Sequence, residues 1–218
     1  MKHLVTTSVI AFAVALGGSV SAQDFTVGLD VLYLDTFANH GTDGTGSAWF
    51  SGTEATPAYR LTGEVDWGGP MDVRARVFAF DADSADPNDI FKLESLDLEA
   101  VFDNTAGSWD LEGFAGLRAA RLDWSDENGS DGFGYEGFGP TLGMSVETDF
   151  GNGLSSVVTG RYSALVGTTT ETASPGDSAD GVMVPAIDFQ LGLEYARDLG
   201  DGRGFTVGGG LESQTYLS

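Results

Sequence analysis

Apolar and polar residues alternate along most of this chain, and the alternation predicts β-strands. In residues 59–67 the apolar side chains share one parity, the odd-numbered positions, and the charged side chains share the other. Residues 71–80 repeat the pattern after Gly68, Gly69 and Pro70. Successive side chains of a strand point to opposite faces, so this segment predicts two strands joined by a tight turn. The same pattern predicts nine strands in all, near residues 25–35, 57–67, 71–81, 91–102, 109–122, 135–149, 154–168, 184–197 and 204–217.

The lengths and the connections of these segments predict a barrel that crosses a membrane. Most segments reach the ~9–11 residues that a tilted strand needs to cross a bilayer. Short connections alternate with long ones, and the long ones cover residues 36–56, 82–90, 123–134 and 169–183. Sorting of this kind is typical of an all-β, up-and-down antiparallel transmembrane β-barrel, here of about 8–10 strands. The alternative is a secreted, water-soluble β-sandwich. Because bacterial single-chain barrels have even strand numbers, we expect either one misassigned segment or a closing strand outside this sequence.

In a membrane barrel the apolar parity faces lipid and the charged parity faces the lumen. The charged residues of that parity are the predicted lumen or pore lining: Arg60, Glu64, Asp66, Asp72, Arg74, Arg76, Asp97, Glu99, Asp110, Glu112, Arg118, Glu147, Arg161 and Glu194. Aromatic residues near strand ends predict the belts that lie at membrane–water interfaces: Phe25, Tyr33, Tyr59, Trp67, Trp109, Trp124, Phe150 and Tyr195.

The first 22 residues have the features of a secretory signal peptide. Lys2 and His3 precede an apolar run from Leu4 to Leu16, and small residues end at Ala22. We expect cleavage near Ala22, residues 23–218 to form the barrel domain, and the bacterial outer membrane as the location.

Composition narrows the possible partners. The mature chain holds nine basic and 33 acidic residues, a formal charge of −24, which argues against nucleic acid and against polybasic attachment to anionic lipid. The chain has no cysteine, so disulfides and thiolate chemistry are excluded. We therefore expect outer-membrane lipid, and small ions or solutes, as partners.

From about Trp109 onward the chain resembles the Legionella-type major outer membrane protein family. The residues that carry the resemblance are GFAGLRAARLDW (113–124), GFGPTLGMSVETDFGNGLSSVVTGRYSALVG (137–167), VPAIDFQLGLEYARDL (184–199) and FTVGGGLESQTYL (205–217). The resemblance implies a pore-forming or structural barrel without catalytic residues. In that family a further strand follows and ends in an aromatic residue. This sequence does not contain that further strand.

Candidate chemistry elsewhere is sparse. His40 lies in a Gly/Thr-rich loop with Asp35 and Asp43 nearby, but no nucleophile accompanies it, so we expect no enzyme and no cofactor. Two acidic loops offer weak calcium candidates, at Asp81, Asp83, Asp86 and Asp89 and at Asp123, Asp126 and Asp131, without the spacing of an EF-hand. Solvated acidic loops are the expected state, with no bound metal.

The function that these patterns favour is a passive, porin-like barrel. An acidic excess in the lumen would make a narrow pore prefer cations, whereas salt bridges between strands would close it into a structural barrel. The alternative is a non-conducting adhesion or binding barrel that works through its long acidic extracellular loops.

Overall fold

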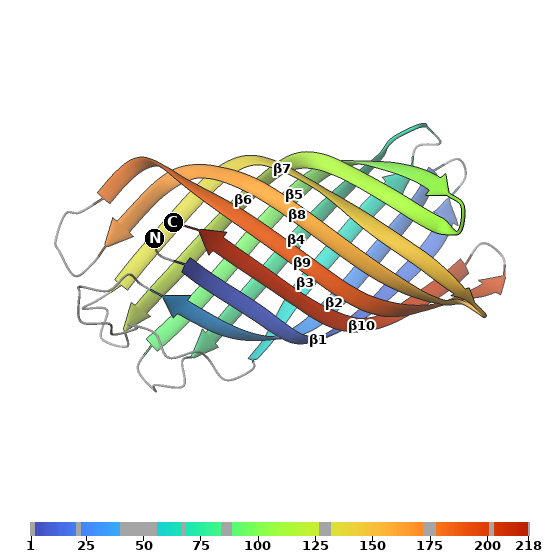
Figure 1. Cartoon of the computed structure of the whole chain (residues 1–218), viewed down its shortest axis with the longest axis horizontal. Coiled ribbons are helices and arrows are strands. Elements are labelled where there is room, and N and C mark those ends of the chain that lie inside the picture. Colours follow the sequence, from blue (N-terminus) through green and yellow to red (C-terminus); the bar gives the residue numbers. More distant parts are fainter. Residues whose placement is uncertain are drawn as a thin grey trace.

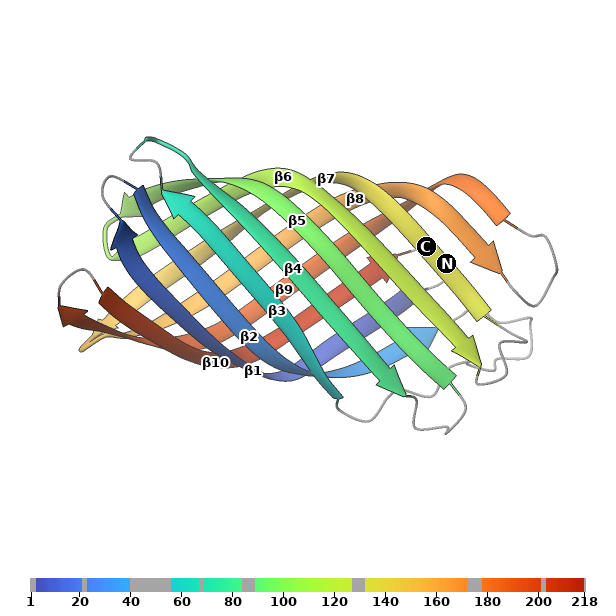
Figure 2. The same cartoon turned by 180° about the vertical axis from the view of Figure 1, so that it is seen from behind.

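The computed structural model shows a closed barrel of ten antiparallel strands (Figures 1 and 2). It describes residues 3–20, 23–39, 56–66, 69–83, 89–126, 132–171, 178–200 and 203–217. The strands are β1 (His3–Val20), β2 (Gln23–Asn39), β3 (Thr56–Asp66), β4 (Asp72–Asp83), β5 (Asp89–Ala106), β6 (Trp109–Asp126), β7 (Gly132–Gly151), β8 (Leu154–Glu171), β9 (Ser178–Gly200) and β10 (Arg203–Leu217). Sequence neighbours pair throughout, and β1 pairs with both β2 and β10. The described residues include no helix long and apolar enough to span a membrane.

The up-and-down antiparallel barrel predicted from the sequence is confirmed. All nine predicted strands are present as β2 to β10, and β1 is the tenth. Residues 3–20 are the ones whose composition predicts a signal peptide. Their removal in the exported protein stays a prediction.

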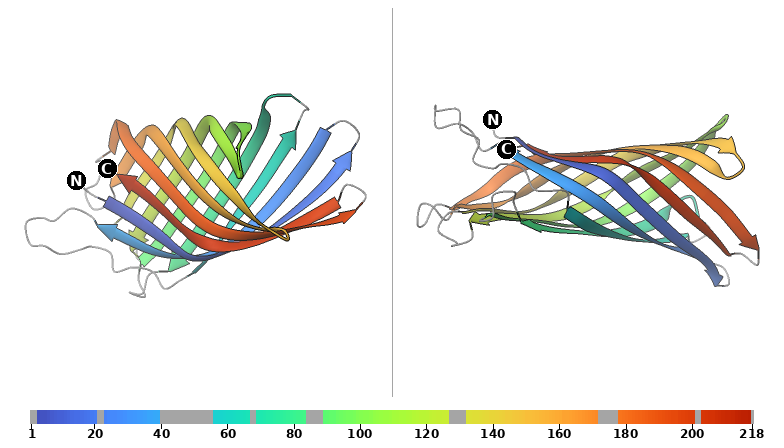
Figure 3. Two further views of the ribbon diagram at one scale, coloured as in Figure 1. Left: turned by 45° about the vertical axis from the view of Figure 1, so that its right-hand side comes forward. Right: turned by 90° about the horizontal axis from the view of Figure 1, so that it is seen from below.

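The two ends of the barrel differ. At one end, tight turns join β5 to β6 and β7 to β8, where Gly107, Asn152 and Gly153 have positive φ. At the other end, marked by the two termini in Figure 1, His3 pairs with both Asn39 and Leu217. We call these the short-turn end and the long-loop end. The strands are strongly tilted and extend well into the predicted long loops (Figure 3): β9, for example, begins at Ser178.

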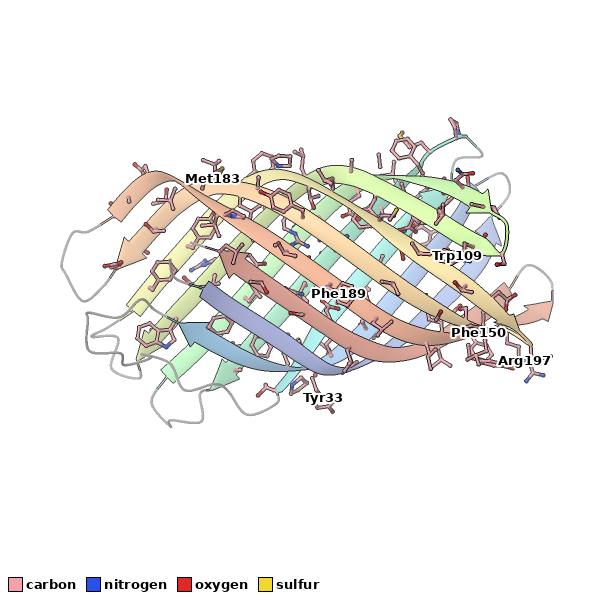
Figure 4. The ribbon with its side chains drawn as sticks, in the orientation of Figure 1. Tyr33, Trp109, Phe150, Met183, Phe189 and Arg197 are labelled. Carbon is pink, nitrogen blue, oxygen red and sulfur yellow. The ribbon has the colours of Figure 1, made fainter. Side chains whose placement is uncertain are left out.

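The outer face of the barrel is apolar over most of its length. Large side chains there are about half exposed, and Figure 4 shows Phe189 and Met183 pointing away from the barrel. Predicted belt residues on this exposed face are Phe25, Tyr33, Tyr59, Trp109, Phe150 and Tyr195. Trp124 was predicted for the same belt, and that prediction is wrong. It packs against the buried apolar cluster inside the barrel, because its even parity on β6 faces inward. Trp67 lies outside the described residues.

Toward the long-loop end the polarity of the sheet reverses, and we call this part the collar. On β5, Lys92 and Glu94 are exposed, whereas Phe91 and Leu93 are fully buried. The outward charges form the exposed ion pairs Lys92–Asp81 and Arg121–Asp123. The inward face is a cluster of Leu32, Leu34, Ala58, Phe78, Phe80, Ala82, Phe91, Leu93, Ala120, Leu122, Tyr135, Leu165, Val184, Ala186 and Tyr216. An apolar inside and a charged outside suit water, so the collar extends beyond the apolar layer of the membrane.

Candidate functional site

The lumen between the collar and the short turns holds the charged residues predicted from the sequence. The register places all fourteen on the inward parity of their strands. The structure brings six of them together in a buried layer: Arg60, Arg76, Asp97, Glu99, Arg118 and Arg161. The other eight lie nearer the short-turn end: Glu64, Asp66, Asp72, Arg74, Asp110, Glu112, Glu147 and Glu194. Their role as pore lining stays a prediction.

Asp97 on β5 is the centre of the buried layer. Its side chain is only 3% exposed and accepts hydrogen bonds from two arginines on the neighbouring strands. Arg118 Nε lies 2.6 Å from Asp97 Oδ1, and Arg76 donates to Oδ2 at 3.0 Å. A buried carboxylate is costly unless it is paired and hydrogen-bonded, and Asp97 meets both conditions.

Further ion pairs of this layer cross the lumen, because they join strands that are not neighbours in the sheet. Arg118 on β6 donates to Asp188 on β9 at 2.7 Å. Arg161 on β8 lies 2.7 Å from Glu99 on β5, and its guanidinium stacks on the ring of Phe114 at 4.6 Å. The layer therefore links strands that are separated by two others in the sheet.

Another crossing pair joins Arg60 on β3 to Glu212 on β10, and Arg60 also lies 3.3 Å from Asp30 on β2. Asp30, Asp188 and Glu212 were missing from the predicted lumen residues. The sequence did carry a signal for them, because each lies on the inward parity of its own strand. Asp188, for example, shares that parity on β9 with Glu194. We call the four arginines and five carboxylates the ion-pair layer: Arg60, Arg76, Arg118, Arg161, Asp30, Asp97, Glu99, Asp188 and Glu212.

The ion-pair layer leaves very little space. It encloses a cavity of about 20 Å³, lined by residues that include Arg76, Arg118 and Asp188. A cavity needs ~10–15 Å³ to hold one water, so this one takes a single water. Above the layer lies the buried apolar cluster of the collar. The described inward side chains are thus buried at two successive levels of the barrel.

Below the layer the lumen is more open and acidic. Arg74 binds two carboxylates, with its Nε 2.6 Å from Glu64 Oε2 and its Nη1 2.7 Å from Glu112 Oε1. Asp110 is exposed and accepts a hydrogen bond from Thr105 at 3.1 Å. We call this region the acidic vestibule: Glu64, Asp66, Asp72, Arg74, Asp110, Glu112, Glu147 and Glu194.

The other candidate chemistry finds little support in the described residues. Asp81 pairs with Lys92 at 2.8 Å, and the side chains of Asp83, Asp86 and Asp89 lie outside the described part. His40 and most of the loop 36–56 also lie outside it. Within the described residues no group of three or more His, Cys, Asp or Glu side chains could hold a metal ion.

Comparison with known proteins identifies the class of barrel. Residues 119–218 match the family described as the Legionella pneumophila major outer membrane protein precursor. The resemblance read from the sequence is confirmed over this range, and the chain is a bacterial outer-membrane β-barrel in contact with lipid. No curated protein matches the chain in sequence.

Solved structures similar to this chain are also outer-membrane proteins. The outer membrane protease OmpT from Escherichia coli shares 9% identity at a TM-score of 0.42, covering 99% of this chain and 95% of that chain. The translocator domain of the autotransporter NalP from Neisseria meningitidis shares 14% at 0.36, covering 99% and 88%. OccK2 (OpdF) from Pseudomonas aeruginosa shares 10% at 0.22, covering 100% and 98%.

Proposed function

We propose that the protein is a structural outer-membrane barrel, without enzymatic activity, whose lumen is closed to ions and solutes. The observation that supports this proposal is the ion-pair layer, in which Asp97, Arg118 and Arg161 have side chains only 3% exposed. An open aqueous pore would leave such charges in contact with water. Export with removal of residues 1–22 near Ala22 belongs to the same proposal.

Size and energetics support a closed lumen. An eight-stranded barrel is nearly filled by its side chains, whereas porins with water-filled channels use ~16–18 strands. Removal of residues 1–22 takes away β1 and leaves nine strands, β2 to β10, so the mature barrel is close to the filled limit. Separating one partner from a buried ion pair costs about 3–5 kcal/mol, so an ion cannot displace Arg118 from Asp97 and Asp188 by a small side-chain motion.

The acidic vestibule favours a second candidate, the narrow cation-preferring pore. Seven carboxylates there face one arginine, and an acidic ring attracts cations. In this candidate the ion-pair layer would have to rearrange to admit an ion. The vestibule alone would then set the selectivity, because the layer itself is nearly balanced with four arginines and five carboxylates.

Solute flux separates the two candidates. The refolded protein is placed in liposomes, and swelling is measured in isotonic solutions of small sugars and of potassium salts. We expect the rate to equal that of protein-free liposomes. Swelling that depends on correctly folded protein would contradict the closed lumen, and swelling with potassium salts alone would support the narrow pore.

A further inference from the structure

Two strand edges of the barrel depend on β1 for their pairing. β1 lies between β2 and β10 and pairs with both (Figure 1). The mature chain, which begins at Gln23 if residues 1–22 are removed as proposed above, has the facing edges of β2 and β10 without this partner. We call the space between these two edges the seam. A backbone N–H or C=O group without a partner costs several kcal/mol in the apolar layer of a membrane, so the seam has to be filled.

The charged lumen is complete without β1. All nine residues of the ion-pair layer lie on β2 to β10, and residues 4–20 contain no charged side chain. Arg60 on β3 forms ion pairs with Asp30 on β2 and with Glu212 on β10, so it joins the two sides of the seam without using a residue of β1. Side chains of the mature chain therefore link the two edges at the level of the ion-pair layer.

The direction of the two edges restricts what can fill the seam. Because β1 is antiparallel to both neighbours, β2 and β10 run parallel to each other, from the short-turn end to the long-loop end. A second copy of the chain in the same membrane orientation offers its own edges only for parallel pairing. Bacterial barrels are built from antiparallel pairs and have even strand numbers, so the seam calls for one strand that runs from the long-loop end to the short-turn end.

The walls of the seam define the side chains that this strand needs. On the outer face, Leu29 on β2 and Val207 on β10 are apolar and about 40–50% exposed, so the residue between them faces lipid and should be apolar. On the inner face, Arg60 already binds Asp30, so a small, uncharged residue fits beside them. The residue of β1 that pairs with Asp30 is Ala13. The strand should keep this alternation over the ~9–11 residues that cross a bilayer.

We propose, resting on the removal of residues 1–22 proposed above, that the seam of the mature protein binds a β-strand of another polypeptide. The bound strand alternates apolar residues with small, uncharged ones, and its backbone pairs with β2 on one side and with β10 on the other. Addition of a strand to an open sheet edge takes its affinity from main-chain hydrogen bonds, and here two edges supply them. The complex has ten strands, the even number that an antiparallel barrel requires.

Disulfide cross-linking tests the proposal in the mature chain, which has no cysteine of its own. The probe is a synthetic peptide of residues 3–20 that carries Val14→Cys, because Val14 pairs with both Val207 and Leu29. The peptide is added while the mature chain refolds into lipid vesicles under mild oxidation. We expect it to cross-link to Val207→Cys and, in a separate variant, to Leu29→Cys, because paired residues of neighbouring strands have the Cα separation of ~4.4–6.8 Å that a disulfide needs.

Leu61→Cys is the matched control. Leu61 is about as exposed on the same outer face as Leu29, with which it pairs, but it lies on β3, one strand farther from the seam. We expect only background cross-linking there. Cross-linking of Leu61→Cys equal to that of Val207→Cys would overturn the proposal, because the peptide would then bind the apolar face at large. Absence of a cross-link to either edge would overturn it as well.

A variant with both Leu29→Cys and Val207→Cys tests whether the edges pair with each other instead. One strand separates these two residues when the seam is filled, so we expect no disulfide between them in the presence of the unmodified peptide of residues 3–20. A disulfide that forms equally with and without this peptide would overturn the proposal. Liposome swelling reports on the lumen and mass spectrometry on the removal of residues 1–22, so the failure of either is distinguishable from an empty seam.

Discussion

Replacing Asp97 tests whether the ion-pair layer holds the barrel together. Arg118 donates to this carboxylate at 2.6 and 3.2 Å, and Arg76 donates at 3.0 Å. Asp97→Ala leaves buried arginines without their shared partner, which costs about 3–5 kcal/mol of unfolding free energy. Asp97→Asn keeps the shape and one acceptor but loses the charge, so we expect a smaller loss of about 1–3 kcal/mol.

Urea unfolding of protein folded in lipid vesicles, followed by tryptophan fluorescence, measures these losses. Asp110→Ala is the control, because Asp110 is also an inward carboxylate but is exposed and accepts only one described hydrogen bond, from Thr105. A change within about 0.5 kcal/mol is expected there. The reasoning is refuted if Asp97→Asn unfolds at the same urea concentration as the parent, since the charge would then contribute nothing.

Three further predictions concern the collar, the packing of the strands and the export of the chain. The chain has no native cysteine, so a single introduced cysteine can be labelled with a membrane-impermeant maleimide in vesicles. Glu136→Cys on the collar should react, while Leu142→Cys on the apolar band should not. Equal labelling of the two variants would contradict the polarity reversal. A Cβ at Gly139 would lie 1.9 Å from the Ala164 carbonyl oxygen, so Gly139→Ala should destabilise the barrel by about 1–3 kcal/mol. Gly160 has open space around it, so Gly160→Ala should change stability by no more than about 0.5 kcal/mol. Similar urea midpoints for the two variants would count against the register of β7 and β8. Mass spectrometry of protein purified from outer membranes should give a chain that begins at Gln23, and an intact chain would show that His3–Val20 is kept as β1.

The sequence was sufficient for the barrel and for the inward parity of its charges. Alternation decides which face a residue joins, so Arg118 and Asp97 could be assigned to the lumen without coordinates. The pairing of Arg118 with Asp188 could not, because contacts across a lumen depend on the strand number and the stagger of the closed sheet.

The collar was missed for a different reason. On β5 the apolar residues Phe91 and Leu93 have odd numbers, whereas Leu96 and Leu98 have even numbers. The apolar residues of β5 therefore change from inward to outward positions near Ser95. The apolar residues of β4 change sides in the same way between Val77 and Phe78. Assigning one apolar parity to each whole strand hid this signal. The same assumption assigned the collar ends of the strands to loops.

Single-channel recording in planar bilayers tests the closed lumen most directly. The mature protein, shown to be folded and inserted, is compared with a variant that combines Arg118→Ser and Arg161→Ser and so removes two cross-lumen pairs. We predict silence from the parent and, in a salt gradient, cation-selective steps from the variant, because the carboxylates remain. Discrete steps from the parent protein would contradict the account.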